Sequence, residues 1–83
     1  VSGDRRTAAL QCRVSELLAQ AIDPRVRLHD FRVEDRDGRV ELIFDAVVPY
    51  DVNRSEEALR SDIDAAISAL GSDYHTTVTI DRG

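Results

Sequence analysis

Apolar residues recur at helical spacing in two stretches of the chain. The first stretch runs from Arg6 to Ala21, and its apolar positions are Leu10, Val14, Leu17, Leu18 and Ala21. Their spacing of three and four residues predicts an amphipathic helix with one core face. We expect this helix to end near Ile22, because Pro24 disfavours helix in the residue before it.

The second stretch with helical spacing of apolar residues lies in the last third of the chain. Its apolar positions are Leu59, Ile63, Ala66, Ile67 and Leu70. Ser55 is a typical N-cap residue for this helix, and Gly71 is suited to close it. The pattern predicts a second amphipathic helix between these two residues.

Alternating apolar residues between the two helices predict a β-hairpin. Two segments rich in β-branched and aromatic residues, Val26 to Glu34 and Val40 to Val48, flank the turn signal Asp37-Gly38. In the second segment, one face carries Val40, Leu42, Phe44, Ala46 and Val48, and this face must be buried. The segment from Tyr74 to Asp81 predicts a third, short strand.

This order of elements predicts a single α+β domain over residues 1–83, with residues 1–5 as a disordered tail. Two helices on one face of a three-stranded sheet make two layers. We expect the third strand to lie beside the second and parallel to it. No element remains to cover the other face of the sheet, so Ile43 and Val47 on that face suggest a partner surface.

The charge balance narrows the class of partner. The chain has 83 residues and a formal net charge of −5, with 11 basic and 16 acidic residues. Such a chain is a poor partner for nucleic acid or anionic lipid, but its acidic side chains suit cations. Its polar start is not a signal peptide, and no apolar run approaches the ~20 residues that span a bilayer. Because the first residue is valine, we expect the chain to be a fragment of a larger protein.

Motifs typical of enzymes are absent from the sequence. It has no Gly-rich phosphate loop, no paired-cysteine zinc motif and no nucleophile elbow. Cys12 is the single cysteine, which excludes an internal disulfide and is typical of a reducing compartment. It lies off the apolar stripe without a base nearby in sequence, so we expect an exposed helix residue. The sequence predicts that the protein is not an enzyme.

Two residues of the predicted hairpin have the chemistry of metal ligands. Asp45 stands between Phe44 and Ala46, in the middle of an apolar strand. A buried unpaired charge costs several kcal/mol, so Asp45 must be paired, solvated or bound to a metal. His29 lies on the strand that pairs with that of Asp45. His75 starts the last strand, where no carboxylate is expected in a comparable position.

The turn leaves the register of the hairpin open. A two-residue turn puts Arg36 opposite Arg39 and His29 opposite Ala46, and it is favoured by apolar matching. A three-residue loop puts His29 opposite Asp45, about 4.5–5.5 Å apart at Cβ. A bulge between His29 and Phe31 would reconcile the two registers.

Asp81 ends the third strand. In the expected topology it approaches His29 and Asp45 at one end of the sheet. One imidazole and two carboxylates suit zinc, manganese or iron(II). His29, Asp45 and Asp81 are therefore the candidate metal ligands.

Several segments together resemble the cytoplasmic domain of cation diffusion facilitators. They are His29-Asp30-Phe31-Arg32, the strand LIFDAVVP from Leu42 to Pro49, the closing Val78-Thr79-Ile80-Asp81, and a helix that ends in Ile22-Asp23. The resemblance covers the chain from about Leu10 to Asp81.

The resemblance implies a ferredoxin-like or metallochaperone-like αββαβ domain that forms a V-shaped homodimer below the membrane domain of the same full-length chain. Members export zinc, manganese, iron, cobalt or cadmium, usually in exchange for protons. Metal bound at the dimer interface tightens the V, at the cytoplasmic face of the membrane. His29 matches a family ligand position, Asp45 a position that is often histidine, and Asp81 a histidine position.

The chain departs from the family pattern in two places. Leu59 stands where some zinc exporters have a ligand histidine, and Gly83 stands where a further acidic ligand would fall. We therefore expect one weak metal site at most. The alternative interpretation is a stand-alone ferredoxin-like module that binds a small ligand, such as an amino acid, at a strand edge. That interpretation lacks the first strand of the usual βαββαβ order.

Overall fold

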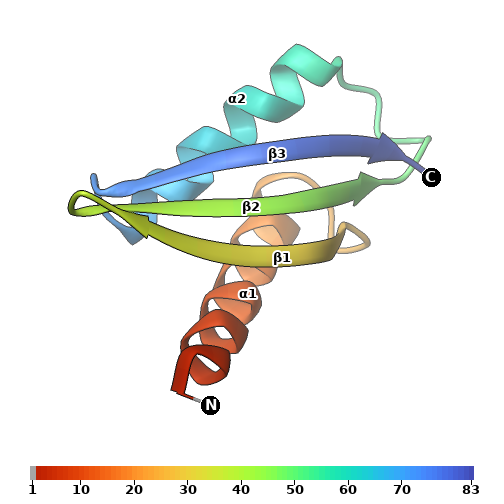
Figure 1. Ribbon diagram of the computed structural model, residues 1–83. Coiled ribbons are helices and arrows are strands. Elements are labelled where there is room, and N and C mark those ends of the chain that lie inside the picture. The colour runs from red at the N-terminus through yellow and green to blue at the C-terminus, as the bar shows by residue number, and fades with distance from the viewer. Residues whose placement is uncertain (1) are drawn as a thin grey trace.

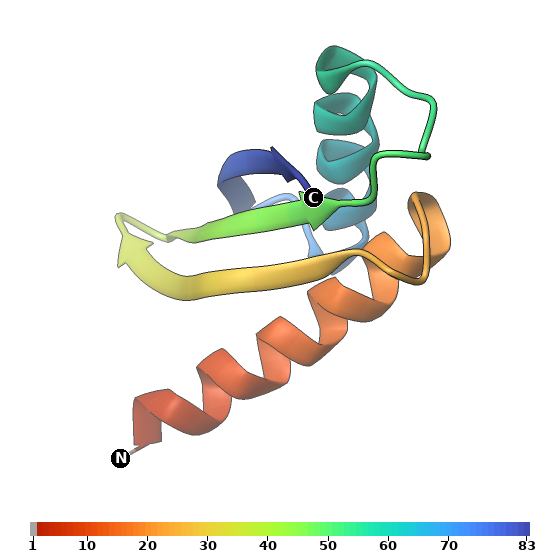
Figure 2. The same ribbon diagram turned by 90° about the vertical axis from the view of Figure 1, so that its right-hand side faces the viewer.

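The computed structural model describes the backbone of residues 2–83 and the side chains from Arg5 onward. Its elements are α1 (Ser2–Ala21), β1 (Arg27–Arg36), β2 (Arg39–Val48), α2 (Glu56–Ile67), the 3-10 turn η1 (Ser68–Leu70) and β3 (Tyr74–Arg82). Both helices lie on one face of the sheet (Figure 1 and Figure 2). The predicted two-layer αββαβ architecture, compatible with a ferredoxin-like α+β fold, is confirmed.

The sheet has the strand order β1-β2-β3, so β2 is the central strand. β1 pairs with β2 antiparallel through the Asp37-Gly38 turn, and β3 pairs with β2 in parallel. A parallel neighbour needs a crossover connection, which α2 provides. The expected topology, a hairpin followed by a parallel neighbour, is confirmed.

Helix α1 begins at Ser2, four residues before the predicted start. Residues 2–5 of the expected tail therefore belong to the helix, and residue 1 lies outside the described residues. Arg6 is tied to β1, because its guanidinium donates to both carboxylate oxygens of Asp35 at 2.7 and 2.9 Å. At the other end, Ala21 is exposed rather than part of the core face, and Ile22 is half-buried.

Helix α2 has the predicted ends. Ser55 accepts a hydrogen bond from the Ala58 backbone N–H at 3.1 Å, and Glu56 and Glu57 complement the positive end of the helix. The last turn tightens into η1, after which Gly71 has φ 138°, a conformation that residues with a Cβ rarely adopt.

The core lies between the helices and the helix-facing side of the sheet. Its buried apolar residues are Val14 and Leu18 of α1, Val26 just before β1, Leu42, Phe44, Ala46 and Val48 of β2, Leu59, Ile63 and Ile67 of α2, and Val78 of β3. The Phe31 ring stacks on Phe44 with the centroids 5.6 Å apart. The strand that is apolar on alternate residues is thus buried on that face, as its pattern predicts.

Candidate metal-binding face of the sheet

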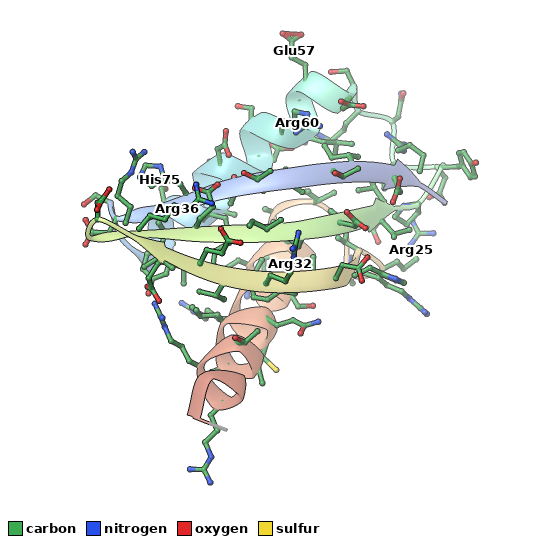
Figure 3. The ribbon with its side chains drawn as sticks, in the orientation of Figure 1. Arg25, Arg32, Arg36, Glu57, Arg60 and His75 are labelled. Atoms are coloured by element: carbon green, nitrogen blue, oxygen red, sulfur yellow. The ribbon has the colours of Figure 1, made fainter. Side chains whose placement is uncertain are left out.

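The face of the sheet that the helices leave uncovered is called the open face below, and Figure 3 looks onto it. Residues paired across strands share a face, so the register assigns its members. They are Arg27, His29, Arg32, Glu34 and Arg36 of β1, Arg39, Glu41, Ile43, Asp45 and Val47 of β2, and His75, Thr77, Thr79 and Asp81 of β3. The face is mostly charged, and Ile43 and Val47 form its apolar centre line.

His29 and Asp45 are direct partners in the β1–β2 ladder. Near the turn the ladder has the two-residue register, with Arg36 opposite Arg39. The register then shifts between His29 and Arg32. The bulge that reconciles the two possible registers is therefore present, and it brings the imidazole-bearing residue opposite the carboxylate.

The bulge rests on Asp30, which has φ 54°. Asparagine and aspartate adopt this left-handed conformation more readily than other residues with a Cβ. One extra residue in β1 is accommodated there, and the alternation of faces continues on both sides. Phe31 therefore packs against Phe44 on the core side, while His29 lies on the open face.

Asp81 lies on the same face, but one step further along the sheet. It pairs with Val47, whereas the β3 partner of Asp45 is Thr79. Within the part of the chain that the structure describes, no three His, Cys, Asp or Glu side chains gather closely enough to hold a metal ion. The sheet thus brings His29 and Asp45 together and leaves Asp81 nearby on the open face.

A shallow hollow of about 440 Å³ lies at the bulge. Its lining includes Asp30, Arg32 and Asp45, together with Ile43 and the edges of Phe31 and Phe44. Asp45 is half-buried, whereas His29 and Arg32 are exposed. A ligand at this hollow would meet the partly desolvated carboxylate of Asp45 and the nearby cation of Arg32.

The other residues considered from the sequence have different surroundings. Cys12 is exposed on α1, as predicted. Leu59 is fully buried in the core. His75 pairs with Glu41 at the far end of β3, where the Thr77 hydroxyl donates to the Glu41 carboxylate at 2.6 Å.

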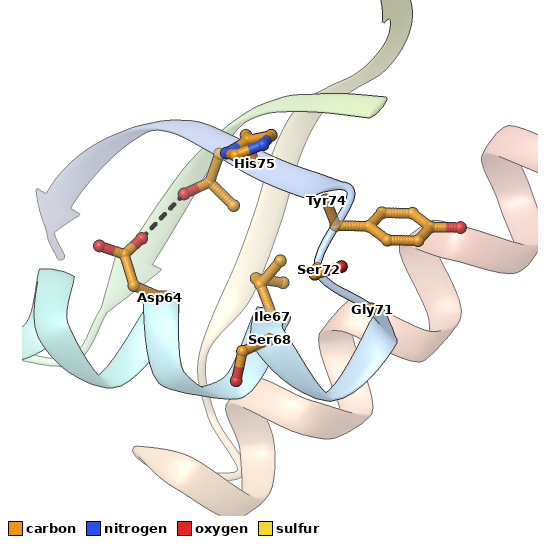
Figure 4. Close-up of a pocket in the computed structure, with 8 residues that line it drawn as sticks. Asp64, Ile67, Ser68, Gly71, Ser72, Tyr74 and His75 are labelled. Carbon is orange, nitrogen blue, oxygen red and sulfur yellow. Dashed lines mark hydrogen bonds between the residues drawn. The ribbon is translucent and has the colours of Figure 1, made fainter. Parts of the chain in front are cut away.

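A second hollow, of about 340 Å³, lies between the end of α2 and the start of β3 (Figure 4). The Thr76 hydroxyl donates to the Asp64 carboxylate there at 3.0 Å, and Ser68, Tyr74 and His75 line the rim. Sequence analysis could not predict this hollow, because its residues come from a helix and a strand and form no motif.

The strongest electrostatic interactions lie away from the candidate ligands. The Arg25 guanidinium and backbone N–H bind Asp23 and hold the pKa of that carboxyl below its usual value of 3.8. Arg25 also binds Asp51, and the two carboxylates raise the pKa of the guanidinium. The Arg6 guanidinium lowers the pKa of Asp35 in the same way.

In residues 2–83, no helix combines the length and the apolar character that crossing a bilayer requires. No family model matches the chain, and neither the curated proteins nor the solved structures contain a significant match to it.

Proposed function

We propose that the chain is a dimerising, divalent-metal-sensing cytoplasmic domain that regulates a membrane cation efflux transporter. The single observation that carries the proposal is the bulge that sets His29 opposite Asp45 on the uncovered face of the sheet. The family-like segments named above support the same role, and so does the αββαβ order. The role is regulatory and not catalytic.

The donor chemistry supports a transition metal. An imidazole nitrogen and a carboxylate oxygen together suit zinc, manganese or iron(II). Their pairing in the β1–β2 ladder brings these two groups to one side of the sheet, where a metal could reach them from solvent. The half-buried Asp45 carboxylate also gains more from a bound cation than an exposed one would.

One copy supplies too few ligands for a closed metal site. His29 and Asp45 are two donors, and a tetrahedral zinc site takes four ligands. A second copy related by a two-fold axis would double the donors, with Asp81 as a further candidate. The open face has an apolar centre line, Ile43 and Val47, on which such a contact could form. Metal sensing and dimerisation are therefore coupled in this proposal.

The test is a calorimetric titration of the purified domain with zinc and with manganese. We expect saturable binding that His29→Ala and Asp45→Asn each weaken at least about tenfold, as loss of a ligand does. His75→Ala is the matched control, because it removes the other imidazole on the same face. Equal loss from His29→Ala and His75→Ala would mean adventitious binding and would refute the proposal.

A further inference from the structure

Strand β3 forms one edge of the sheet, because it pairs with β2 alone. At its two ends, the Val40 N–H donates to the Asp73 carbonyl at 2.9 Å and the Gly83 N–H donates to the Val48 carbonyl at 3.1 Å. The odd-numbered residues therefore direct their backbone groups toward β2. Because these directions alternate along a strand, the even-numbered residues from Tyr74 to Arg82 direct theirs toward the open edge.

Arg60 of α2 covers the middle of this edge. Its guanidinium Nη1 donates to the Val78 carbonyl at 2.8 Å, and its Nε donates to Glu56 one helical turn away at 3.2 Å. The bond to Val78 agrees with the alternation, since Val78 is even-numbered. Long edge strands attract further strands, and a charge placed on the edge is a common protection.

The sequence of β3 is self-complementary when it is read antiparallel to itself about Val78. His75 of one copy then lies opposite Asp81 of the other, so that a histidine meets a carboxylate on the open face. Thr77 lies opposite Thr79, a pair that stabilises sheets, and Thr76 lies opposite Ile80 on the helix side. Each of these pairs occurs twice, as a two-fold contact requires.

Neighbouring registers are less favourable. A slip of two residues in one direction sets Asp73 opposite Asp81, and like charges directly opposite each other are destabilising. A slip in the other direction leaves His75 opposite Gly83, which has no side chain. Slips by one residue would set edge-facing groups against groups that already bond to β2.

We propose that the β3 edge is a strand-pairing surface for a second copy of this chain, and that Arg60 guards it. Pairing about Val78 uses the Val78 carbonyl of each copy, so both Arg60 side chains must first withdraw. The resulting contact extends the sheet through its edge. It involves Asp81, the further candidate ligand, but neither His29 nor Asp45, on whose pairing the proposed function rests. The edge contact and the proposed function can therefore fail separately.

Disulfide trapping tests the register directly. In the Cys12→Ser background, Thr77→Cys and Thr79→Cys proteins are oxidised separately and as a mixture. Residues in a non-hydrogen-bonded antiparallel pair have Cα atoms ~4.5 Å apart, within the range that a disulfide spans. We expect the disulfide dimer mainly in the mixture. A disulfide dimer formed mainly by Thr77→Cys alone, or mainly by Thr79→Cys alone, would indicate a register slipped by two residues and would contradict pairing about Val78.

The proposal that Arg60 hinders strand pairing is tested by adding Arg60→Ala to both cysteine variants. Loss of a charge-assisted hydrogen bond that pairing must break should raise the yield of mixed disulfide about tenfold under limiting conditions. Arg54→Ala is the matched control, because it removes the 2.7 Å ion pair with Asp62 at the same helix and leaves the edge untouched.

Three further results would overturn the proposal. One is absence of disulfide in the mixture even with Arg60→Ala. Another is equal yield in all three samples, which random collision would give. The third is a yield that Arg60→Ala and Arg54→Ala change alike, because stacking of two open faces would bring these threonines together without involving Arg60.

Discussion

At the scale of single residues, Asp30 is the position on which the candidate site depends. Its positive φ creates the bulge, and the bulge lets both the Phe31–Phe44 stack and the His29–Asp45 pair exist in one hairpin. In a regular ladder with the same turn, these two features would exclude each other. The strained residue therefore lies next to the proposed ligands, as bulges often do at functional sites.

We expect the effect of an Asp30 substitution on the free energy of unfolding to depend on how readily the new residue adopts a positive φ. Asp30→Gly should change the free energy of unfolding by less than about 1 kcal/mol, because glycine adopts this φ without strain. Asp30→Val should lower it by about 1–2 kcal/mol, because a β-branched residue resists the left-handed region. Urea unfolding measures both. Equal stability of the two variants would show that the conformation at this position is not the constraint.

Sequence reasoning predicted the helical stripes and the buried strand face well, because Val14, Leu18, Leu59, Ile63 and Ile67 follow spacing that packing enforces. It could not choose the register, since apolar matching and ligand pairing favoured different turns. Asp30 carries no signal of a positive φ comparable to that of a glycine. The first turn of α1 was also missed, because the residues there do not continue the helical spacing of apolar residues on which the prediction relied.

At the scale of elements, the loop between β2 and α2 is organised by one side chain of β3. The Arg82 guanidinium donates to the carbonyls of Pro49, Val52 and Arg54 at 3.1, 2.5 and 3.1 Å. These hydrogen bonds hold the loop against β3, and the loop presents Tyr50, a residue that is 77% exposed. The contact joins the carboxyl end of β3 to the segment that leads into α2.

Replacing Arg82 should loosen this loop. Arg82→Ala is expected to lower the free energy of unfolding by about 2 kcal/mol, because several hydrogen bonds to a charged donor are lost. Arg82→Lys should recover only part of this, since an ammonium cannot reproduce the planar fork. Arg39→Ala, at the exposed start of β2, is the control, and it should change the free energy of unfolding by less than about 0.5 kcal/mol. If denaturant unfolding shows the same loss of stability for Arg39→Ala as for Arg82→Ala, the proposed role of Arg82 in holding the loop is contradicted.

Helix α1 is joined to β1 by Arg6 and Asp35, and this contact should be sensitive to acid. The pKa of Asp35 is lowered in the folded chain, and so is that of Asp23. A lowered pKa adds stability above the ordinary value of 3.8, and this stability is lost as pH falls through the folded pKa. The contribution of these two carboxylates to stability should therefore be constant above pH ~4 and should be lost below it.

Circular dichroism between pH 2 and 5 measures the effect, with Asp35→Asn as the comparison. The amide cannot titrate, so the variant should lose less stability than the wild type over this range. An identical acid profile for the two proteins would show that the Arg6–Asp35 pair does not contribute.

At the scale of the whole molecule, the packed core is separate from the proposed metal ligands. The core of both helices and the sheet is complete without any of the proposed ligands, since His29, Asp45 and Asp81 all lie on the open face. The domain should therefore fold without metal, unlike a zinc finger. Metal should act on the arrangement of two copies, for which a bias of ~1–3 kcal/mol is ordinary.

Sequence reasoning could place candidate ligands on this face but could not complete a site. Asp81 was expected to approach His29 and Asp45, yet its ladder partner is Val47 and not Asp45. In the proposed function, a second copy supplies the missing coordination positions. A contact between copies depends on surface geometry, which the pattern of apolar and polar residues in one chain does not reveal. Leu59 and Gly83 stand where further metal ligands would be expected from the resemblance. The resulting expectation of one weak metal site at most stays a prediction.

Small-angle X-ray scattering of the domain, with and without saturating zinc, tests the central claim most directly. At a concentration where light scattering gives a dimer, zinc should make the wild-type dimer more compact. It should leave the dimer of His29→Ala unchanged, while His75→Ala should respond like the wild type. A scattering curve that zinc does not alter in the wild type, or that it alters equally in His29→Ala, would contradict a metal-sensing role for this domain.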